Sequence, residues 1–310
     1  MSDLDKTKYM ANVDRVRILA AFGVVSYHTH SDLSRNPGVV GFIILMMFFS
    51  IFTVSRANIS NLLVVFKKKF TRLIEPWLFW SVIYGLSKLI KVVLNDVPVS
   101  ETFSMTMFLT GTKIHLWFLP FAFVTSGLLA VICSKTTSMS DIRNIIIASL
   151  IGVLSIFCFS IVSSRYTLPV PFGQWMLGFP AVPLGFAIGR SLVLNKFYDR
   201  LKFYLFLIVL IAVVCVAVGS MGYGLKYAVR YCVAIVIVLP VLCLRGNIDP
   251  VSKRLATLTY GIYLIHPLVL TVLTLLHLPE LHPLLLLALT IFLSAFAVVV
   301  LRKTPIKRFV

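Results

Sequence analysis

The sequence predicts an all-α polytopic membrane protein, a bundle of about ten transmembrane helices, and three observations support this fold class. Of the 310 residues, 59% are hydrophobic and 13% are charged, whereas soluble domains carry about 25% charged residues. The mean hydropathy is +0.97. The apolar residues also gather in stretches of about 20 residues, the length that crosses a bilayer as a helix. This composition excludes a secreted disulfide scaffold, a cytosolic enzyme and a disordered tail.

Ten apolar stretches give the predicted helices in chain order. The first stretch follows basic residues, as the apolar part of a signal peptide would. However, it continues into Tyr27 and His28, and no small-residue cleavage site follows, so we expect a transmembrane helix. Each of the ten approaches the length that a spanning helix needs, the first and the eighth being the shortest. The predicted spans are about 16–31, 39–55, 75–94, 115–134, 144–163, 173–191, 203–222, 228–244, 256–275 and 282–301.

The distribution of basic residues predicts the topology. Ten spans place both termini on one side of the membrane, and 22 of the 29 Lys and Arg residues fall in segments on that side. Because Lys and Arg hold short loops in the cytoplasm, we expect cytoplasmic termini and a location in the cell membrane. The net charge of +18 therefore indicates topology and does not point to nucleic acid.

The whole chain, residues 1–310, is expected to form a single integral-membrane domain with no appended soluble domain. Any chemistry must then be built inside the helix bundle or at its mouths. The five cysteines lie within or at the ends of apolar stretches without CxxC spacing, so they are interpreted as buried small side chains and no metal site is predicted. The oligomeric state is left open.

A polar cluster begins the first span and is followed by a histidine. Asp14 and Arg17 stand at its start, and His28 follows Arg17 by eleven residues, about 16 Å along a helix. Polar groups at membrane depth are costly and are functional candidates, and histidine readily exchanges protons near neutral pH. The structural alternative is an arginine that snorkels to the interface and a histidine satisfied by a neighbouring helix.

A second, basic cluster precedes the third span. Lys69 and Arg72 are three residues apart and share a helix face if this segment is helical, and Pro76 suits the first turn of the next helix. Such cations can hold the phosphates of a nucleotide-like cofactor such as coenzyme A. The alternative is that they serve the positive-inside rule and attract anionic lipid.

Two further histidines mark later spans. His115 precedes Trp117 at the outer end of the fourth span, where it lines the outer mouth or lies in the headgroup layer. His266 follows Tyr263 in the middle of the ninth span and precedes Pro267, which frees a backbone carbonyl that needs another partner. We expect His266 to face the bundle, and we treat these two segments as candidate substrate-pocket elements.

Together these clusters resemble membrane-bound acyltransferase family 3, whose members O-acetylate bacterial surface polysaccharides and peptidoglycan and N- or O-acylate related glycans. Members have ten spans with cytoplasmic termini, an Asp-x-x-Arg stretch with an Arg-x10-His pattern, a basic pair before the third span, a His-Leu-Trp-Phe-Leu segment and a late Tyr-Leu-Ile-His-Pro segment. The matching positions are Asp14, Arg17 and His28; Lys69, Arg72 and Pro76; residues 115–119; and residues 263–267.

The chain departs from the family pattern at two places. The family often carries Phe-Phe-x-x-Ser-Gly in its second span, where this chain reads FFSIFT over residues 48–53. Lys69 also replaces the first arginine of the basic pair, and an ammonium group does not grip a phosphate bidentately as a guanidinium does.

The resemblance implies an acyltransferase that moves an acetyl or other acyl group from cytoplasmic acetyl-CoA to a hydroxyl of a cell-surface polysaccharide or related glycan. It implies that Lys69, Arg72 and Arg17 hold the donor phosphates. It also implies that His28 is the catalytic base or takes the acyl group itself, and that the catalytic residues Arg17 and Asp14 orient each other at the entrance of the helix. His115, Trp117, Tyr263 and His266 would then lie around the substrates.

Two other classes of protein remain open from the residues alone. A transporter or flippase for a lipid-linked or polymeric glycan accounts for the spans and the charge asymmetry, and would use His28 and His266 as pathway or proton-relay residues. A structural or assembly subunit accounts for the hydropathy but not for Arg17 and His28. Dependence on acetyl-CoA separates the enzyme from the transporter.

Overall fold

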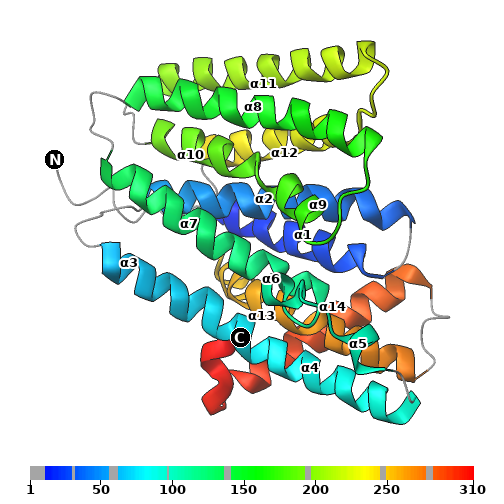
Figure 1. Ribbon diagram of the computed structural model, residues 1–310. Helices are drawn as coiled ribbons and strands as arrows, with labels where there is room; N and C mark the ends of the chain where they lie inside the picture. The colour runs from blue at the N-terminus through cyan, green and yellow to red at the C-terminus, as the bar shows by residue number, and fades with distance from the viewer. Residues whose placement is uncertain are drawn as a thin grey trace. The chain divides into compact units, whose positions relative to one another are not determined.

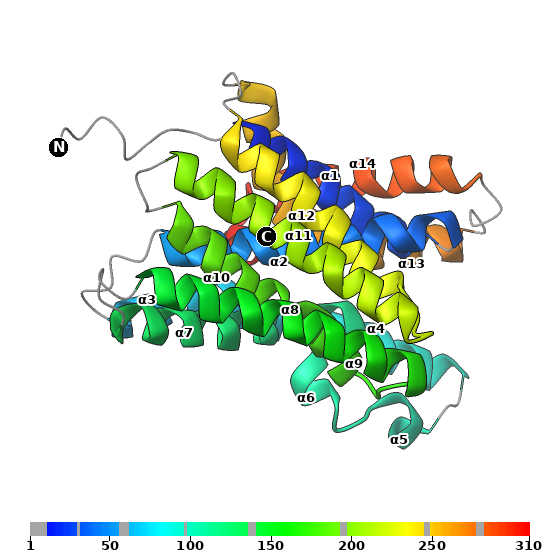
Figure 2. The same ribbon diagram turned by 90° about the horizontal axis from the view of Figure 1, so that it is seen from above.

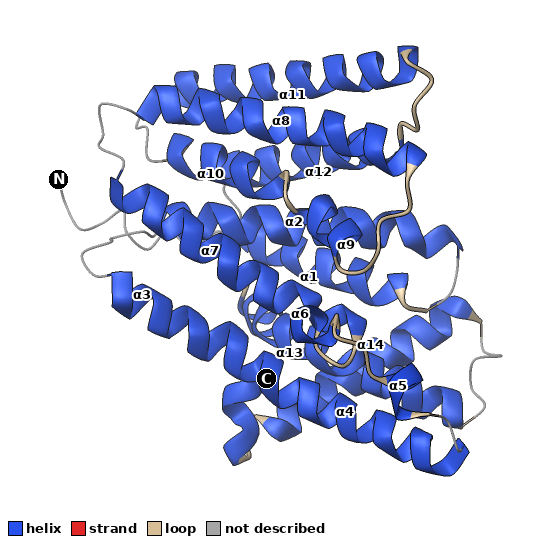
Figure 3. Ribbon diagram, in the orientation of Figure 1, coloured by secondary structure: helices blue, strands red, loops and turns tan. Residues whose placement is uncertain are grey.

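The computed structural model describes residues 11–29, 32–55, 62–95, 98–135, 141–192, 197–244, 249–276 and 282–310. Within these residues every regular element is a helix and none is a strand, which confirms the predicted fold class (Figure 3). Eight helical segments there are long and apolar enough to cross a membrane: Asn36–Ser55, Leu62–Leu94, Ile114–Lys135, Ile142–Arg165, Leu201–Ser220, Lys226–Cys243, Pro250–Leu275 and Pro283–Leu301. The number of spans and the side of the termini stay predictions.

The first and sixth predicted spans differ from the observed helices. Helix α1 is Ala11–Tyr27, so it begins and ends several residues before the predicted 16–31, and residues 30 and 31 lie outside the described part. The predicted span 173–191 is divided into α9 (Phe172–Gly178) and α10 (Ala181–Ser191). Pro180 lies at the division, and because proline has no N–H to donate to the preceding turn, the hydrogen-bond ladder of one continuous helix is interrupted there.

The third span is longer than predicted and contains an irregular turn. Helix α3 (Leu62–Lys69) continues through the π-helix η2 (Phe70–Ile74) into α4 (Glu75–Asn95), as Figure 1 shows. The predicted start at residue 75 coincides with the start of α4, and Pro76 lies in its first turn as expected. Single π-helical turns inside helices are rare and often occur at functional sites.

The chain forms two compact units, each described here by itself. Unit 1 comprises Met1–Leu45, Arg230–Thr304 and Val310, and unit 2 comprises Met46–Val229 and Pro305–Phe309. The remaining elements are α2 (Asp32–Ser55), α5 (Val99–Thr102), α6 (Met107–Thr110), η3 (Ile114–Trp117), α7 (Phe118–Lys135), α8 (Asp141–Arg165), α11 (Phe197–Ser220), α12 (Lys226–Cys243), α13 (Pro250–Leu275), α14 (Pro283–Leu301) and η6 (Pro305–Phe309).

In unit 1, α1 packs along α13, and α13 packs along α14 (Figure 1). The start of α2 approaches α1 through glycines. A Cβ atom on Gly41 would lie 2.5 Å from the Ala20 carbonyl oxygen, and one on Gly38 would lie 2.5 Å from the Tyr27 Cβ. Only residues without a side chain allow two helices to come this close, as at other membrane helix interfaces.

Polar and charged groups gather at the starts of α1 and α13 at one end of unit 1. Asp249 caps α13, and hydrogen bonds from the Ser252 hydroxyl and the Val251 amide, with the charge of Arg15 nearby, hold the pKa of its carboxyl below its ordinary value. At the same end Arg302 donates to Thr257 Oγ1 at 3.1 Å and to the Thr257 carbonyl. Helices α1 and α13 therefore start at the same end and run parallel.

In unit 2, α8 packs against both α10 and α11, and Figure 2 shows the three helices side by side from a second direction. Close packing again depends on glycine. A Cβ atom on Gly152 of α8 would lie 2.6 Å from the Leu184 Cγ, and one on Gly185 of α10 would lie 2.5 Å from the Ser50 Cβ. Helix α3 packs on α7, where the rings of Phe66 and Phe70 meet Phe123 edge-on.

The 3₁₀-helix η6 is attached to α4 by aromatic contacts within unit 2. The Phe309 ring stacks on Phe79 with the ring centroids 4.4 Å apart and the planes 3° from parallel, and the Trp80 Nε1–H donates to the Phe309 carbonyl at 2.9 Å.

We expect Phe309→Ala to lower the free energy of unfolding by about 1 kcal/mol through loss of the aromatic pair. Thermal unfolding in one detergent measures the effect, and Phe292→Ala, at a 69% exposed phenylalanine of α14, is the matched control. Equal melting temperatures for the two variants would contradict the prediction.

Candidate active site

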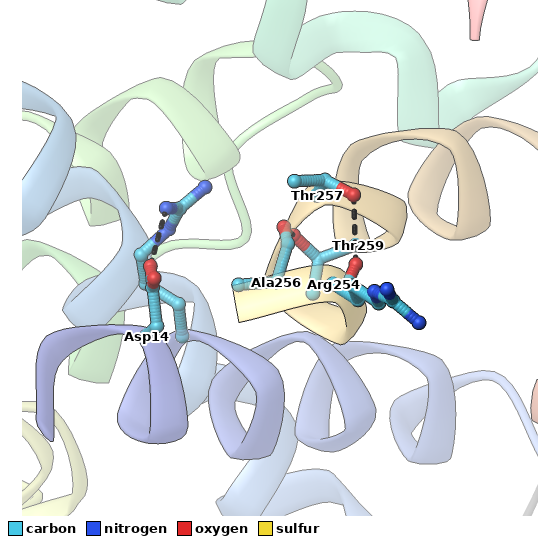
Figure 4. Close-up of polar contacts among 6 residues, drawn as sticks. Asp14, Arg254, Ala256, Thr257 and Thr259 are labelled. Atoms are coloured by element: carbon cyan, nitrogen blue, oxygen red, sulfur yellow. Dashed lines mark hydrogen bonds and ion pairs between the residues drawn. The ribbon is translucent and has the colours of Figure 1, made fainter. Parts of the chain in front are cut away.

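Asp14 and Arg17 form an ion pair on the first turns of α1. The Arg17 Nη1 donates to the Asp14 Oδ1 at 3.0 Å, and the two side chains are 34% and 14% exposed. A spacing of three residues places both on one helix face. Figure 4 shows this pair together with the start of α13, which carries Arg254 and Thr257. The guanidinium uses one of its five N–H donors on Asp14, so it can bind an anion and stay oriented.

His28 lies in the tight turn that ends α1. Its backbone N–H donates to the Val25 carbonyl at 3.0 Å, and the next residue, Thr29, donates through both its backbone N–H and its hydroxyl to the Ser26 carbonyl. These bonds close the last turn of the helix and fix the position of the His28 backbone. The imidazole is half-buried, a suitable position for a group that must meet a substrate.

The His28 ring faces a second histidine from a distant part of the chain. The centroids of the His28 and His266 rings are 5.1 Å apart, with the planes inclined by 42°. His266 is fully buried in α13, and Tyr263, one helical turn earlier, has its ring 6.2 Å from the His266 ring. The predicted bundle-facing position of His266 fits this burial. Three sequence-predicted residues thus lie together in unit 1.

The ion pair and the histidine pair lie at different levels of α1. Eleven residues separate Arg17 from His28, about 16 Å along the helix axis. The ion pair therefore lies at the start of α1, at the distance from His28 that the sequence spacing predicts. Because α1 and α13 run parallel, unit 1 carries cations at one end of this helix pair and two imidazoles farther along it.

Lys69 lies at the end of α3, in unit 2, and its ammonium group is directed toward α2. The Nζ donates to the Thr53 Oγ1 at 3.0 Å and lies 4.5 Å from the centroid of the Phe49 ring, a cation–π contact. Phe49 and Thr53 are four residues apart on one face of α2, so both reach the same cation. The two departures from the family pattern, at Lys69 and in residues 48–53, therefore meet in one contact.

Lys69 and Arg72 lie on either side of the start of the π-helical turn. Lys69 is half-buried at the end of α3, whereas Arg72 is exposed within η2. The charge of Arg72 acts on Lys69, so the two cations lie near each other. Their common role stays a prediction.

His115 and Trp117 lie in the 3₁₀-helix η3 of unit 2, and both are buried, with 4% and 8% exposure. The His115 ring meets the Tyr84 ring of α4 edge-on at 5.2 Å between centroids. Trp117 packs on Phe121, one turn into α7. The structure therefore surrounds His115 with protein side chains.

Phe49, Thr53 and Tyr84 are the contacts that sequence reasoning missed. The i, i+4 spacing of Phe49 and Thr53 is a visible signal that they share a helix face, but nothing in the sequence says which cation lies opposite. Tyr84 is one of many aromatic residues in apolar stretches and carries no signal of its own. Among the described ranges, no three His, Cys, Asp or Glu side chains gather as a metal-ligand set.

Comparison with known proteins gives one match. The model of a family described as an acyltransferase domain, acyltransferase family 3, matches residues 10–302. This range includes every residue discussed above except those of η6. Neither a curated protein nor a solved structure shows significant similarity to the chain.

Proposed function

Because this chain belongs to acyltransferase family 3, we propose that it moves an acetyl group from acetyl-CoA to a hydroxyl of a cell-surface polysaccharide or related glycan. Family membership and the apolar helices establish a membrane acyltransferase, and they favour transfer chemistry over the transporter reading. The proposal also includes acetyl-CoA as the donor and a glycan hydroxyl as the acceptor. It further includes a location in the bacterial inner membrane with cytoplasmic termini.

The proposal rests on two observations. The rings of His28 and His266 lie next to each other, and Arg17 lies on the same helix as His28. Coenzyme A is a long molecule whose thioester lies far from its phosphates. A site that binds the phosphates and a site that reacts with the thioester must therefore be separated. The distance of about 16 Å along α1 between Arg17 and His28 suits such a donor. We assign phosphate binding to Arg17, Lys69 and Arg72, and the chemistry to His28.

In the proposed reaction a neutral His28 accepts the proton of the acceptor hydroxyl as its oxygen attacks the thioester carbonyl. A carbon–oxygen bond forms, and the carbon–sulfur bond breaks when the tetrahedral intermediate collapses. The proton on His28 then passes to the departing thiolate, which leaves as free coenzyme A. In the second form of the mechanism the His28 nitrogen attacks the thioester carbonyl, the carbon–sulfur bond breaks and coenzyme A leaves as the thiolate. The acceptor oxygen then attacks the acyl carbon, the nitrogen–carbon bond breaks, and the acceptor proton passes to the thiolate. Both forms require a neutral imidazole.

Transfer of label from acetyl-CoA tests the proposal. Purified protein in nanodiscs is incubated with acetyl-labelled acetyl-CoA, with and without a glycan extract of its host, beside longer acyl-CoAs. We expect label on glycan and release of free coenzyme A, both dependent on the extract. Turnover only with a longer acyl-CoA would correct the donor, and turnover without label on glycan would correct the acceptor. Absence of turnover with every acyl-CoA and acceptor would overturn the proposal and restore the transporter reading.

Removal of the basic side chains should weaken donor binding more than turnover. We expect Arg72→Ala to raise the KM for acetyl-CoA severalfold with a smaller change in kcat, because it contacts phosphates remote from the reacting carbonyl. Lys69→Ala should act in the same direction and less strongly, since Thr53 and Phe49 already hold its ammonium. Initial rates over a range of donor concentrations measure both constants.

Lys68→Ala is the matched control for these variants. It removes one positive charge from an exposed position next to Lys69, so it reports the general loss of charge at this end of α3. Its donor KM should stay close to the wild-type value. A KM for Arg72→Ala no higher than that of the control would remove Arg72 from the donor site.

A further inference from the structure

Aromatic side chains of η3, α7 and α9 form one continuous cluster within unit 2. Between ring centroids, Trp117 of η3 lies 5.8 Å from Phe121 of α7, and Phe121 lies 5.9 Å from Trp175 of α9. The Phe172 ring meets the Trp175 ring at 6.2 Å, with the planes inclined by 72°. Helix α9 is thus joined to η3 and α7 by aromatic contacts.

Helix α9 presents its aromatic residues on one face. Phe172, Trp175 and Phe179 follow one another by three and four residues, the spacing of neighbours on one side of a helix. Backbone bonds of 2.9 Å from Phe172 to the Pro169 carbonyl and from Trp175 to the Pro171 carbonyl fix the start of this helix. Phe172 and Phe179 are 50% and 47% exposed, so this face of α9 is open at both of its ends.

Two polar side-chain atoms of α9 are buried and have no hydrogen-bond partner in the described part of the chain. They are the Trp175 Nε1, a donor, and the Gln174 Oε1, an acceptor. A buried polar atom without a partner is costly, so a ligand that supplies the partner gains binding energy. A tryptophan of the aromatic belt keeps its indole N–H at the wet interface, whereas the Trp175 Nε1 is covered by protein. Trp175 is therefore unlike an ordinary belt residue.

The chemistry of the cluster favours a sugar ring as its ligand. A sugar ring has C–H faces that pack on aromatic rings, and its hydroxyl groups accept from an indole N–H and donate to an amide oxygen. The phosphates of coenzyme A would need cations, and the cluster is made of aromatic and amide side chains only. A hydrocarbon chain would leave the Trp175 Nε1 and the Gln174 Oε1 without partners.

We propose that Trp175 and Gln174 bind a sugar ring of the glycan acceptor, an assignment that rests on the proposed function. The rings of Trp117, Phe121 and Phe172 form the aromatic wall of this subsite, which extends the pocket role expected for Trp117 to α9. The sugar reaches the two polar atoms when neighbouring side chains turn, and the half-exposed Phe172 has room to turn. Because the acceptor is a chain of sugars, a subsite for one ring selects the glycan without taking part in the transfer.

Binding of glycan in the absence of acyl-CoA tests the subsite apart from catalysis. The glycan extract of the host is labelled with a fluorophore at its reducing ends and titrated with the protein in nanodiscs. We expect Trp175→Ala to raise the Kd about 10-fold through loss of the aromatic surface. Trp175→Phe keeps a flat ring without the N–H, and Gln174→Leu removes the amide, so each should raise the Kd about 3-fold.

Phe206→Ala is the matched control for these variants, since Phe206 is a 46% exposed aromatic residue of α11 in the same unit. Its Kd should equal the wild-type value. A Kd for Trp175→Ala no higher than that of the control, or no binding of the extract to the wild type, would overturn the proposal.

Transfer kinetics separate a sugar subsite from a structural role. We expect Trp175→Ala to raise the KM for glycan with little change in the KM for acetyl-CoA, because the cluster contacts only the acceptor. Equal rises in both constants would indicate a general disturbance of unit 2 and would contradict the subsite. Glycan binding that depends on Trp175, without any transfer of label, would instead count against the proposed function and leave the subsite in place.

Fluorescence tests whether lipid covers this face of α9. The difference between the wild type and Trp175→Phe gives the emission of Trp175, measured in nanodiscs that contain brominated phospholipid, which quenches tryptophan on contact. We expect little quenching of Trp175 and a change in its emission when the glycan extract is added. Strong quenching that the extract does not relieve would place lipid against Trp175 and overturn the proposal.

Discussion

Replacement of His28 by alanine should reduce acyl transfer to background, a loss of about 10²- to 10⁴-fold in kcat. The imidazole is the only group in the proposed reaction that takes the acceptor proton. His28 ends α1 in a turn made by backbone bonds, so its side chain can be removed with little effect on the helix. Label transfer from acetyl-CoA measures the rate, and insertion with thermal unfolding shows that the variant is folded.

His282→Ala is the matched control, since this histidine is exposed at the start of α14 and stands outside the proposed site. Its transfer rate should equal that of the wild type.

The wild-type rate should also fall when the pH is lowered enough to protonate His28, because imidazolium cannot accept the acceptor proton. A folded His28→Ala variant that keeps the wild-type rate would remove His28 from the chemistry.

A methyl group on Gly41 should disturb both the fold of unit 1 and its activity. In Gly41→Ala the new Cβ would lie 2.5 Å from the Ala20 carbonyl oxygen, a backbone atom that cannot rotate away. Helices α1 and α2 must then separate, and overpacking of this kind costs about 1–3 kcal/mol of unfolding free energy. Because α1 carries Arg17 and His28, we also expect slower transfer. Thermal unfolding and the label assay measure the two effects.

Gly224→Ala provides the comparison for that variant. A Cβ atom on Gly224 would meet nothing within 4 Å, so the same chemical change there leaves all packing intact. Its melting temperature should stay at the wild-type value. If the melting temperature of Gly41→Ala equals that of this control, the close approach of α1 and α2 does not limit the stability of the protein.

Hydropathy was sufficient to predict the helices but not their irregularities. The apolar stretches predict α7, α8 and α14 within a few residues, since length and composition decide whether a segment spans a membrane. Pro180 was visible in the sequence, yet a window of 20 residues averages over the division between α9 and α10. The π-helical turn at Phe70–Ile74 has no signal of its own in the sequence, because hydropathy does not distinguish a π-helical turn from an α-helical one.

The candidate site was predictable residue by residue but not as an arrangement. A charge or an imidazole in an apolar stretch identifies Arg17, His28 and His266 as costly and therefore notable. Nothing in the sequence states that α1 lies parallel to α13, so the meeting of the two histidines could not be predicted. The sequence did indicate that Pro267 frees a backbone carbonyl. Only the structure shows that the His266 Nδ1 lies 2.9 Å from the Tyr263 carbonyl oxygen.

The division of unit 1 between two distant stretches of chain sets the order in which the protein can be assembled. Unit 2 is almost entirely the continuous stretch Met46–Val229, whereas unit 1 joins Met1–Leu45 to Arg230–Thr304. During synthesis α1 must wait until α13 has emerged and entered the membrane, after all of the helices between them. The two imidazoles therefore meet only late in biogenesis, and a ribosome-bound chain that stops within unit 2 carries His28 without its partner.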